Sequence, residues 1–338
     1  MCTEIIVSFR EIICKCKFSH DKVRNVCFVA LLLFCSLGLM LESSIASRYS
    51  EPPFIYVLMY NGLGSLLLLL VSVWIVDAFE LFAIFLFQLS RCNVVTKTRI
   101  KNRYIQHRHV GKAVLILVLY FILVLNGTIV GYSKPRTRTI EIPLKRLPSC
   151  LDGYEIVMIA DLHVGSLVGR AEVQQIVNRV NEEFDADAIV LVGDIGDQAV
   201  GSVTKTKLEP LRDLVSRDGV FWTSGNHENM RGVQDYRDAM SALNVTVLEN
   251  ARRSLPISER RTRSCNASFD LAGLADHSGS QDNTFNDDDV LKPDFDVATL
   301  NRNQSHALVL LNHQPIHSKE YAKRGAGLIL SGHTHGGQ

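Results

Sequence analysis

Residues 154–165 read YEIVMIADLHVG, a short apolar run that ends in Asp161-Leu162-His163. The run Glu155–Ala160 is rich in isoleucine and valine and has the length of a buried β-strand. Asp161 and His163 have side chains that bind divalent metal ions. Ligand sites in α/β proteins collect beyond the carboxyl ends of the strands, so this stretch predicts a strand followed by part of a metal site.

Four further apolar runs are each followed by residues that can bind metal. They are Ala188–Val192 before Gly193-Asp194, Val220–Thr223 before Gly225-Asn226-His227-Glu228, Ala307–Leu311 before Asn312-His313, and Gly327–Leu330 before Gly332-His333-Thr334-His335. Any one of these motifs alone is usually a turn or a solvated side chain. Because all of them follow predicted strands, they indicate strand ends that converge on one site.

The segments between these runs predict helices, further strands and loops. Helical spacing occurs at Ala171–Glu183, Leu208–Ser216 and Asp235–Leu243, and strand-like runs occur at Val245–Leu248 and Ser268–Leu274. Arg252–Ala267 and Asp276–Asp289 are polar and typical of loops. Strands that alternate with helices predict an α/β fold with a buried central sheet across residues 139–338.

Residues 1–138 have a different character. Long apolar runs cover residues 23–41, 54–76 and 113–132, and a membrane-spanning helix needs about 20 such residues. The runs are apolar on all sides, unlike soluble core helices, and a cleaved signal peptide would explain only the first. Ala78–Leu89, interrupted by Glu80, is either a fourth span or a continuation of the second helix along the interface. We expect an N-terminal multi-pass membrane region with about three spans that contacts membrane lipids.

The distribution of lysine and arginine bears on the orientation. These residues are concentrated before the first run and between residues 91 and 112. Three spans place both basic segments in the cytoplasm and residues 139–338 on the other side, whereas four spans violate the positive-inside rule. The sequons at Asn244, Asn266 and Asn303 agree with an exported domain, but the basic residues at 134–146 oppose it. We expect the non-cytoplasmic side.

Composition narrows the functional classes. The net charge is +1 and no long basic stripe lies outside the membrane flanks, so nucleic acid is not expected as a partner. The absence of a Cys-x-x-Cys pair argues against a structural zinc site. Cys150 and Cys265 could form a disulfide in an exported domain or remain two free thiols.

The five motifs, D-x-H, G-D, G-N-H-E, H and G-H-x-H in this order, resemble the pattern of the calcineurin-like metallophosphoesterase superfamily over roughly Gly153–Gln338. The form Asp-Leu-His-Val-Gly, the closing Gly-His-Thr-His-Gly-Gly-Gln and the membrane context are similar to the branch that includes transmembrane proteins with a metallophosphoesterase domain and the bacterial YkuE-like enzymes. The resemblance implies a β-sandwich of mixed sheets flanked by helices.

The resemblance also implies the metal ligands. One ion would be bound by Asp161, His163, Asp194 and His335, and the other by Asp194, Asn226, His313 and His333, so that Asp194 bridges them. Carboxylate, amide and imidazole ligands without thiolate suit Mn, Fe, Zn or Co, and the identity of the two divalent ions stays open. Two such ions about 3.5–4 Å apart can share a hydroxide that attacks phosphorus in line.

Two further residues are catalytic candidates. His227 would donate a proton to the leaving oxygen or hydrogen-bond the phosphate, and Asp197 would orient His227 or is a loop carboxylate. Glu228 is expected to make a structural hydrogen bond. His306 and His317 compete with His313, which is preferred because it directly follows an apolar run.

Two departures from the family pattern bear on which subfamily of phosphoesterases the sequence resembles. The first motif lacks the leading Gly-Asp of the protein Ser/Thr phosphatases, and Gln198 stands where their clamping Arg would be. Asp197 occupies the position of the iron-binding Tyr of purple acid phosphatases. Both subfamilies are therefore disfavoured.

These inferences predict a membrane-anchored dimetal phosphoesterase that hydrolyses a phosphodiester or phosphomonoester. A lipid-linked substrate is plausible from the membrane location alone. The alternative is a catalytically weak scaffold or receptor whose metal site is structural. A transporter subunit has little support, because the spans carry only Asp77 and Glu80 as intramembrane-type charges, and these lie at a helix edge. A finished fold of this family normally has further strand after Gln338, so one interpretation is a fragment or a truncated gene product.

Overall fold

The computed structural model describes residues 48–89, 94–131, 133, 135–256, 267–280 and 290–336. The chain divides into two compact units, one of which contains the long apolar helices. The other joins Glu42–Pro53 to Thr137–Gln338. The predicted span at residues 23–41 lies outside the described residues.

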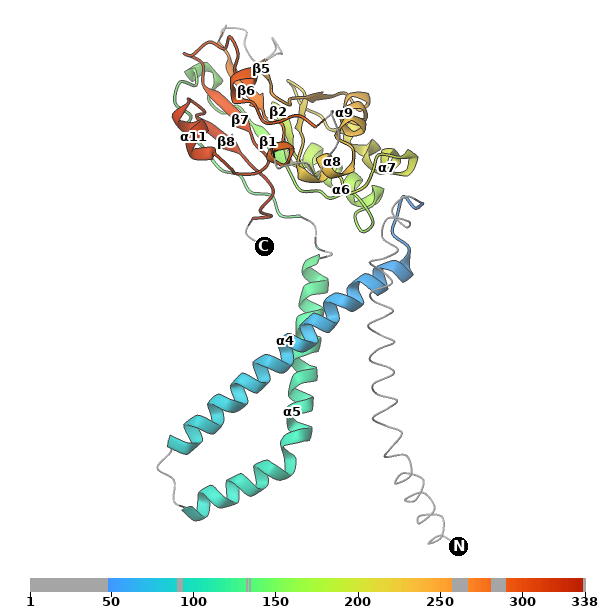
Figure 1. Cartoon of the computed structure of the whole chain (residues 1–338), viewed down its shortest axis with the longest axis vertical. Coiled ribbons are helices and arrows are strands. Elements are labelled where there is room, and N and C mark those ends of the chain that lie inside the picture. Colours follow the sequence, from blue (N-terminus) through green and yellow to red (C-terminus); the bar gives the residue numbers. More distant parts are fainter. Residues whose placement is uncertain are drawn as a thin grey trace. The chain divides into compact units, whose positions relative to one another are not determined.

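The first unit contains two long helices, α4 (Phe54–Leu89) and α5 (Val94–Gly131) (Figure 1). Their segments Gly64–Phe87 and Val110–Gly131 are long and apolar enough to cross a membrane, and almost no side chain in them is covered by protein. Helix α4 continues without a break through Ala78–Leu89, so this stretch extends the second predicted helix and is not a separate span.

A lysine of α5 pairs with the two acidic residues of α4, Asp77 and Glu80. Lys112 donates a hydrogen bond to Glu80 at 2.7 Å and forms an ion pair with Asp77. Charges within apolar helices normally pair with one another or face a polar interior. The pairing accounts for Asp77 and Glu80 without a transport path.

The second unit is built on two four-stranded sheets. Sheet 1 contains β1 (Ile156–Ile159), β2 (Ala188–Val192), β3 (Val220–Thr223) and β4 (Val245–Val247) in that order, all parallel. Sheet 2 contains β5 (Ala251–Leu255), β6 (Phe269–Gly273), β7 (Leu308–Leu311) and β8 (Leu328–Leu330), with β5 antiparallel to β6 and the other pairs parallel. The expectation that both sheets are mixed is therefore wrong for sheet 1.

Successive side chains along a strand pack alternately in two different hydrophobic cores. In β2, Ala188, Val190 and Val192 belong to the core shared with sheet 2, whereas Ile189 and Leu191 pack in the core under the helices. Side chains of a strand point alternately to its two faces, so a wholly apolar strand is buried on both. The sandwich of two sheets between helices agrees with the predicted architecture.

Helices cover the outer face of each sheet. The helices over sheet 1 are α6 (Arg170–Glu183) and α9 (Val233–Ala242), and α6 buries Val173, Val177 and Val180, which lie on one face at helical spacing. Over sheet 2, Phe295 of α10 (Phe295–Ala298) stacks on Tyr321 of α11 (Ser318–Lys323).

Two sequence expectations are wrong. The helix predicted at Leu208–Ser216 is replaced by α7 (Ser202–Leu208) and a 3₁₀ turn, Glu209–Asp213, because Pro210 lacks the N–H that would continue the α-helix. Strand β5 lies largely within the predicted loop Arg252–Ala267. Its mostly polar side chains are typical of a loop, but its backbone pairs with β6 and so forms a strand. Residues 277–280 form a 3₁₀ turn within the other predicted loop.

Candidate metal centre

The predicted ligand residues follow the carboxyl ends of β1, β2, β3, β7 and β8. At most of these positions the backbone is left-handed: φ is between 47° and 66° at Asp161, His163, Asp194, His333 and His335. Non-glycine residues adopt this region rarely, and such positions cluster at functional sites. The loops therefore turn sharply as they leave the strands, which lets the side chains converge.

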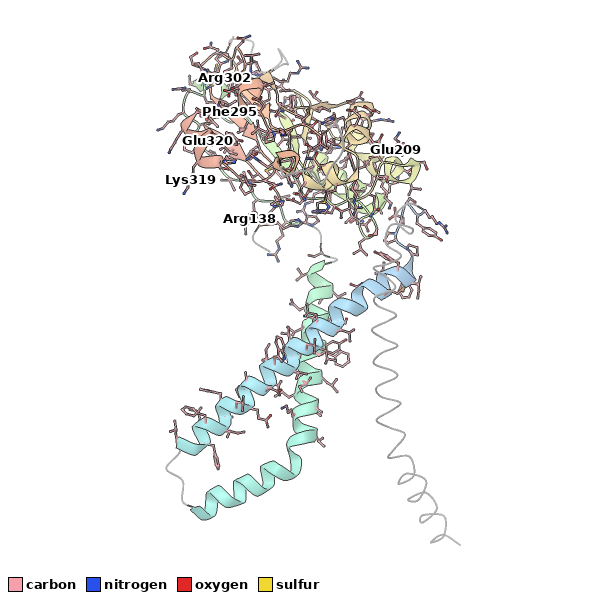
Figure 2. All side chains as sticks on the ribbon, viewed as in Figure 1. Arg138, Glu209, Phe295, Arg302, Lys319 and Glu320 are labelled. Atoms are coloured by element: carbon pink, nitrogen blue, oxygen red, sulfur yellow. The ribbon has the colours of Figure 1, made fainter. Side chains whose placement is uncertain are left out.

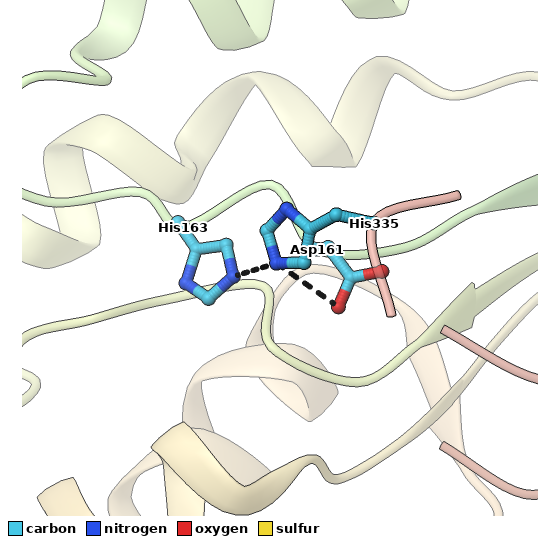
Figure 3. Close-up of side chains that lie close together, drawn as sticks. All are labelled: Asp161, His163 and His335. Atoms are coloured by element: carbon cyan, nitrogen blue, oxygen red, sulfur yellow. Dashed lines mark hydrogen bonds and ion pairs between the residues drawn. The ribbon is translucent and has the colours of Figure 1, made fainter. Parts of the chain in front are cut away.

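A first group consists of Asp161, His163 and His335, and Figure 3 shows the three side chains facing one another. The Nε2 atoms of His163 and His335 are 3.0 Å apart, and His335 Nε2 lies 3.9 Å from Asp161 Oδ1. The Asp161 carboxylate also accepts a hydrogen bond from the backbone N–H of His333 at 2.8 Å. One aspartate thus contacts both histidines of the last motif.

A second group consists of Asp194, His313 and His333. His313 Nε2 lies 3.1 Å from Asp194 Oδ2, and His333 Nδ1 lies 2.9 Å from the Asn226 side-chain oxygen. Asp194 Oδ2 is also 4.0 Å from His163 Nε2, so this carboxylate faces both groups. The predicted ligands are brought together in the arrangement that a shared, bridging Asp194 requires.

The donor atoms fit bound cations. His313 Nδ1 donates to the carbonyl of Val192 at 2.8 Å, which leaves the lone pair of a neutral His313 on Nε2. This Nε2 is buried, has no hydrogen-bond partner among the described residues, and faces a carboxylate. Two electron-rich atoms this close require a positive charge or a proton between them. Oxygen and imidazole ligands without thiolate suit Mn, Fe, Co or Zn.

Without a cation, a proton takes that place. Burial disfavours the charged imidazole of His313, but the Asp194 carboxylate outweighs it and raises the pKa of His313 to about 9. Burial likewise opposes ionisation of Asp194, yet His313 and the backbone N–H of His227 hold the pKa of this carboxyl below its usual value. The site is thus built to keep Asp194 ionised.

Asp197 contacts two histidines at once. Its Oδ1 accepts a hydrogen bond from His163 Nδ1 at 2.6 Å, and His227 Nδ1 lies 2.6 Å from the same oxygen. Burial works against the charge, but His163 and His227 keep the pKa of Asp197 well below its usual range. Asp197 also raises the pKa of both histidines. Asp197 thus lies beside both His227 and His163, of which the sequence indicated only His227.

Glu228 organises the backbone beneath the ligands. Its side chain is fully buried and accepts hydrogen bonds from four backbone N–H groups, those of Asp194, Ile195, Gly196 and Gly225. Burial, reinforced by the charge of Asp194, raises the pKa of Glu228 to about 7. The structural hydrogen bond predicted for this residue is confirmed, and it extends to two ligand loops.

Two glycines permit the close approach of the loops. A Cβ on Gly225 would lie 2.2 Å from Asp194 Oδ1, and a Cβ on Gly193, which has φ of +72°, would lie 2.4 Å from His313 Nδ1. Any other residue at these positions would collide with a predicted ligand.

The rival histidines lie elsewhere. His306 is 3.9 Å from Asp270 and 3.5 Å from Ser268 Oγ, and His317 is 3.6 Å from Glu320. The preference for His313 therefore agrees with the geometry. The Val192 carbonyl, which orients His313, was missed because backbone groups have no signature in the sequence.

Comparisons with known proteins agree with this geometry. Residues 154–337 match the family described as calcineurin-like phosphoesterase. The chain is 27% identical to the Danio rerio transmembrane protein with metallophosphoesterase domain, over 86% of this chain and 62% of that protein. It is 32% identical to the Bos taurus protein of the same description, over 66% of this chain and 50% of that one. It is 29% identical to the uncharacterized metallophosphoesterase YkuE of Bacillus subtilis, over 57% of this chain and 62% of that protein.

The resemblance inferred from the motifs is thereby confirmed. The chain spans between 50% and 62% of the length of these relatives. The family match covers more than half of the chain and contains every predicted metal ligand. This chain belongs to the calcineurin-like phosphoesterase family.

Proposed function

We propose that this chain is a membrane-anchored phosphoesterase that uses two divalent metal ions to hydrolyse a phosphodiester or phosphomonoester. The observation that carries the proposal is the position of Asp194, whose carboxylate belongs both to a group with His163 and His227 and to a group with His313 and His333. Asp161, His163, Asp194 and His335 would bind one ion, and Asp194, Asn226, His313 and His333 the other. Two bound ions would supply an activated water and would neutralise charge on the phosphoryl oxygens.

His227 would serve as the proton donor. Its Nδ1 lies 2.6 Å from Asp197 Oδ1, and its ring stands edge-on to His163 with 4.7 Å between the ring centroids. The Asp197 carboxylate raises the pKa of His227 and so favours its protonated form. When protonated, a half-buried imidazole beside the metal ligands can protonate a leaving alkoxide or hydrogen-bond the phosphate.

The test is hydrolysis of bis-p-nitrophenyl phosphate and p-nitrophenyl phosphate by the full chain in detergent micelles with Mn²⁺. Turnover should require metal and should be lost in Asp194→Asn, while Asp213→Asn, the same change at an exposed residue, should retain it. The ratio of the two rates distinguishes a diesterase from a monoesterase. A folded, metal-loaded protein that hydrolyses neither ester would favour the alternative, a scaffold or receptor with a structural metal site.

We propose further that α4 and α5 cross the membrane as a hairpin, with residues 139–338 on the non-cytoplasmic side. The basic residues between 97 and 112 then lie at the cytoplasmic end, in accord with the positive-inside rule. Cys150 is disulfide-bonded, as is typical of exported domains, and Cys265 lies outside the described residues. Asn244 and Asn303 are exposed and available to glycosylation.

Glycosylation in a eukaryotic cell would test this orientation. We expect the full chain to lose apparent mass on treatment with an N-glycosidase, and Asn244→Gln with Asn303→Gln to reduce that shift. Ser305→Ala is a matched change, because it removes the sequon of Asn303 without altering Asn303 itself. An unshifted chain, together with labelling of the domain by a cytoplasmic reagent, would place it on the other side.

The membrane location favours a lipid-linked phosphoester as substrate. Helix α5 ends at Gly131 and the second unit begins at Thr137, so the chain leads directly from a candidate membrane helix into this unit. A phosphodiester embedded in a vesicle should therefore be hydrolysed faster by the chain in the same bilayer than by the chain in separate micelles. Equal rates would indicate a soluble substrate.

A further inference from the structure

The residues just before α4 pack against the catalytic unit. In this pre-α4 segment (Arg48–Pro53), the carbonyl of Ser50 accepts a hydrogen bond from Arg170 N–H at 3.2 Å, and Glu51 Oε1 accepts one from Ala171 N–H at 3.0 Å. These are unpaired N–H groups at the start of α6, where a carboxylate is favourable because of the helix dipole. Glu51 thus caps a helix that lies about 120 residues away in sequence.

The fit at this junction is close. A Cβ on Gly169 would lie 2.4 Å from Glu51 Oε2 and 2.8 Å from the Ser50 carbonyl oxygen. Gly169 has φ of −97°, a value that any residue adopts, so its lack of a side chain is needed for space alone. The segment is therefore seated in a space that only glycine leaves open.

A buried lysine fixes the loop that leads into α6. Lys207 of α7 is 2% exposed, and its Nζ donates a hydrogen bond to the carbonyl of Gly165 at 2.7 Å. Burial lowers the pKa of Lys207, and the Glu51 carboxylate opposes this effect by favouring the charged form. A buried cation is tolerated when a negative charge and hydrogen bonds compensate it.

Gly165 belongs to the loop that carries a predicted ligand. It lies two residues after His163, whose N–H donates to the Asp194 carbonyl at 3.0 Å. The carbonyl of Val164, which lies between His163 and Gly165, accepts a hydrogen bond from Asp197 N–H at 3.0 Å. Lys207 therefore holds the far end of a loop that connects His163 to Asp194 and Asp197.

We propose that Glu51 is a positioning residue for the ion site formed by Asp161, His163, Asp194 and His335. It acts through the start of α6 and the turn that leads to it, in which Gly165 N–H donates to the Val168 carbonyl at 3.0 Å. The inference rests on the proposed function, because it assigns a role at the same metal centre. Helix α4 begins at Phe54, three residues after Glu51. The other ion site shares Asp194, but its own ligands Asn226, His313 and His333 do not contact Val164 or Gly165 in the hydrogen bonds described above.

The experiment is calorimetric titration of Mn²⁺ into the metal-free full chain in nanodiscs. Glu51→Gln should weaken one of the two binding steps about tenfold, the lower end of the effect of residues that orient metal ligands, and leave the other within about twofold. The weakened step should be the one that His335→Ala removes, and not the one that His333→Ala removes. Lys207→Met should weaken the same step.

A double variant separates coupling from coincidence. If Glu51 and Lys207 act on the same loop, Glu51→Gln combined with Lys207→Met should weaken Mn²⁺ binding by less than the sum of the two single losses in binding free energy. Gly169→Ala tests the same junction without altering a charge and should reproduce the Glu51→Gln effect. Glu209→Gln is the matched control, an exposed carboxylate (Figure 2) that pairs with Arg170 at the same helix end, and should change neither step.

Each other result has a defined meaning. Two unchanged affinities in Glu51→Gln, a parallel loss at both steps, or additive losses in the double variant would overturn this inference while leaving the phosphoesterase proposal intact. A correctly folded wild-type chain that binds no divalent ion would contradict the proposed function and this inference with it.

Discussion

Two fully buried carboxylates of the second unit are used in different ways, Glu228 beyond β3 of sheet 1 and Asp270 on β6 of sheet 2. Glu228 accepts hydrogen bonds from backbone N–H groups of the ligand loops. Asp270 instead accepts from side chains, Arg252 at 3.0 Å and Ser254 at 2.9 Å. The same chemical group is thus used once to fix backbone and once to pair side chains along a sheet edge.

The difference shows what positions the metal centre. Backbone N–H groups that all point to one carboxylate fix the course of the loops carrying Asp194 and Asn226, whichever way the side chains turn. The Arg252–Asp270 pair joins two neighbouring strands, and β5 contributes no predicted ligand. We therefore expect changes at Glu228 to reach the metal site and changes at Asp270 to affect stability alone.

The largest effect should come from Glu228→Gln. The amide replaces an acceptor with an N–H₂ group that faces N–H donors, so the loops should shift and Mn²⁺ affinity should fall by about 10- to 100-fold. The free energy of unfolding should fall by about 1–3 kcal/mol. Titration calorimetry and thermal unfolding measure the two quantities.

Asp270→Asn is the counterpart of that variant. It should lower the free energy of unfolding by a similar amount, because a buried partner of Arg252 is lost, and should leave Mn²⁺ affinity within about twofold. Loss of metal binding in Asp270→Asn, or normal binding in Glu228→Gln, would break the comparison.

A smaller effect is expected from Gly225→Ala. The added Cβ would meet both Asp194 Oδ1 and the Asp194 backbone nitrogen, so one ligand loop must move at a cost of about 1–3 kcal/mol in stability. Mn²⁺ affinity should fall with it. Gly201→Ala is the matched control, because nothing lies within 4 Å of its Cβ, and a similar loss there would show that the contact with Asp194 is irrelevant.

The pH dependence of metal binding tests the electrostatics at sheet 2. The pKa of His313 is raised to about 9, so below that pH a proton occupies the position that an ion needs. Mn²⁺ affinity should therefore rise with pH up to about 9, by at most about tenfold per unit for one displaced proton. Calorimetry in buffers of different ionisation enthalpy counts the protons released.

A change at His313 supplies the control for that measurement. His313→Ala should reduce the number of protons released, whereas His306→Ala, which removes a histidine of sheet 2 away from the ligands, should not. Affinity that does not vary with pH from 7 to 9 would contradict the assignment of His313 as a ligand.

The smallest effect should come from Ser254→Ala on β5. It removes one hydrogen bond to Asp270 and should cost about 1 kcal/mol in stability. Turnover and Mn²⁺ affinity should stay unchanged. A measurable loss of turnover would mean that the edge of sheet 2 communicates with the metal site after all.

Much of this unit could be predicted from the sequence because the signals are local. The apolar runs before Asp161, Asp194 and His313 have the length and composition of buried strands, and the structure has strands there. Strand β5 could not be predicted, since Arg252 and Ser254 give no apolar alternation and only the pairing with β6 defines it. The apolar spacing of Leu208–Ser216 is helical, but Pro210 lacks the N–H that would continue α7, so that helix ends at Leu208.

By itself, the sequence determined the residue types of the metal centre, their order along the chain and their place after strands, because each of these is a property of neighbouring residues. Only the tertiary structure decided that Asp197 contacts both His163 and His227, that Glu228 gathers the N–H groups of two loops, and that Glu51 caps α6. Except for the Gly225 hydrogen bond to Glu228, those contacts join residues that are 30 or more positions apart in the sequence. They depend on the packing of the two sheets and on backbone atoms, which are the same in every residue and leave no pattern to read.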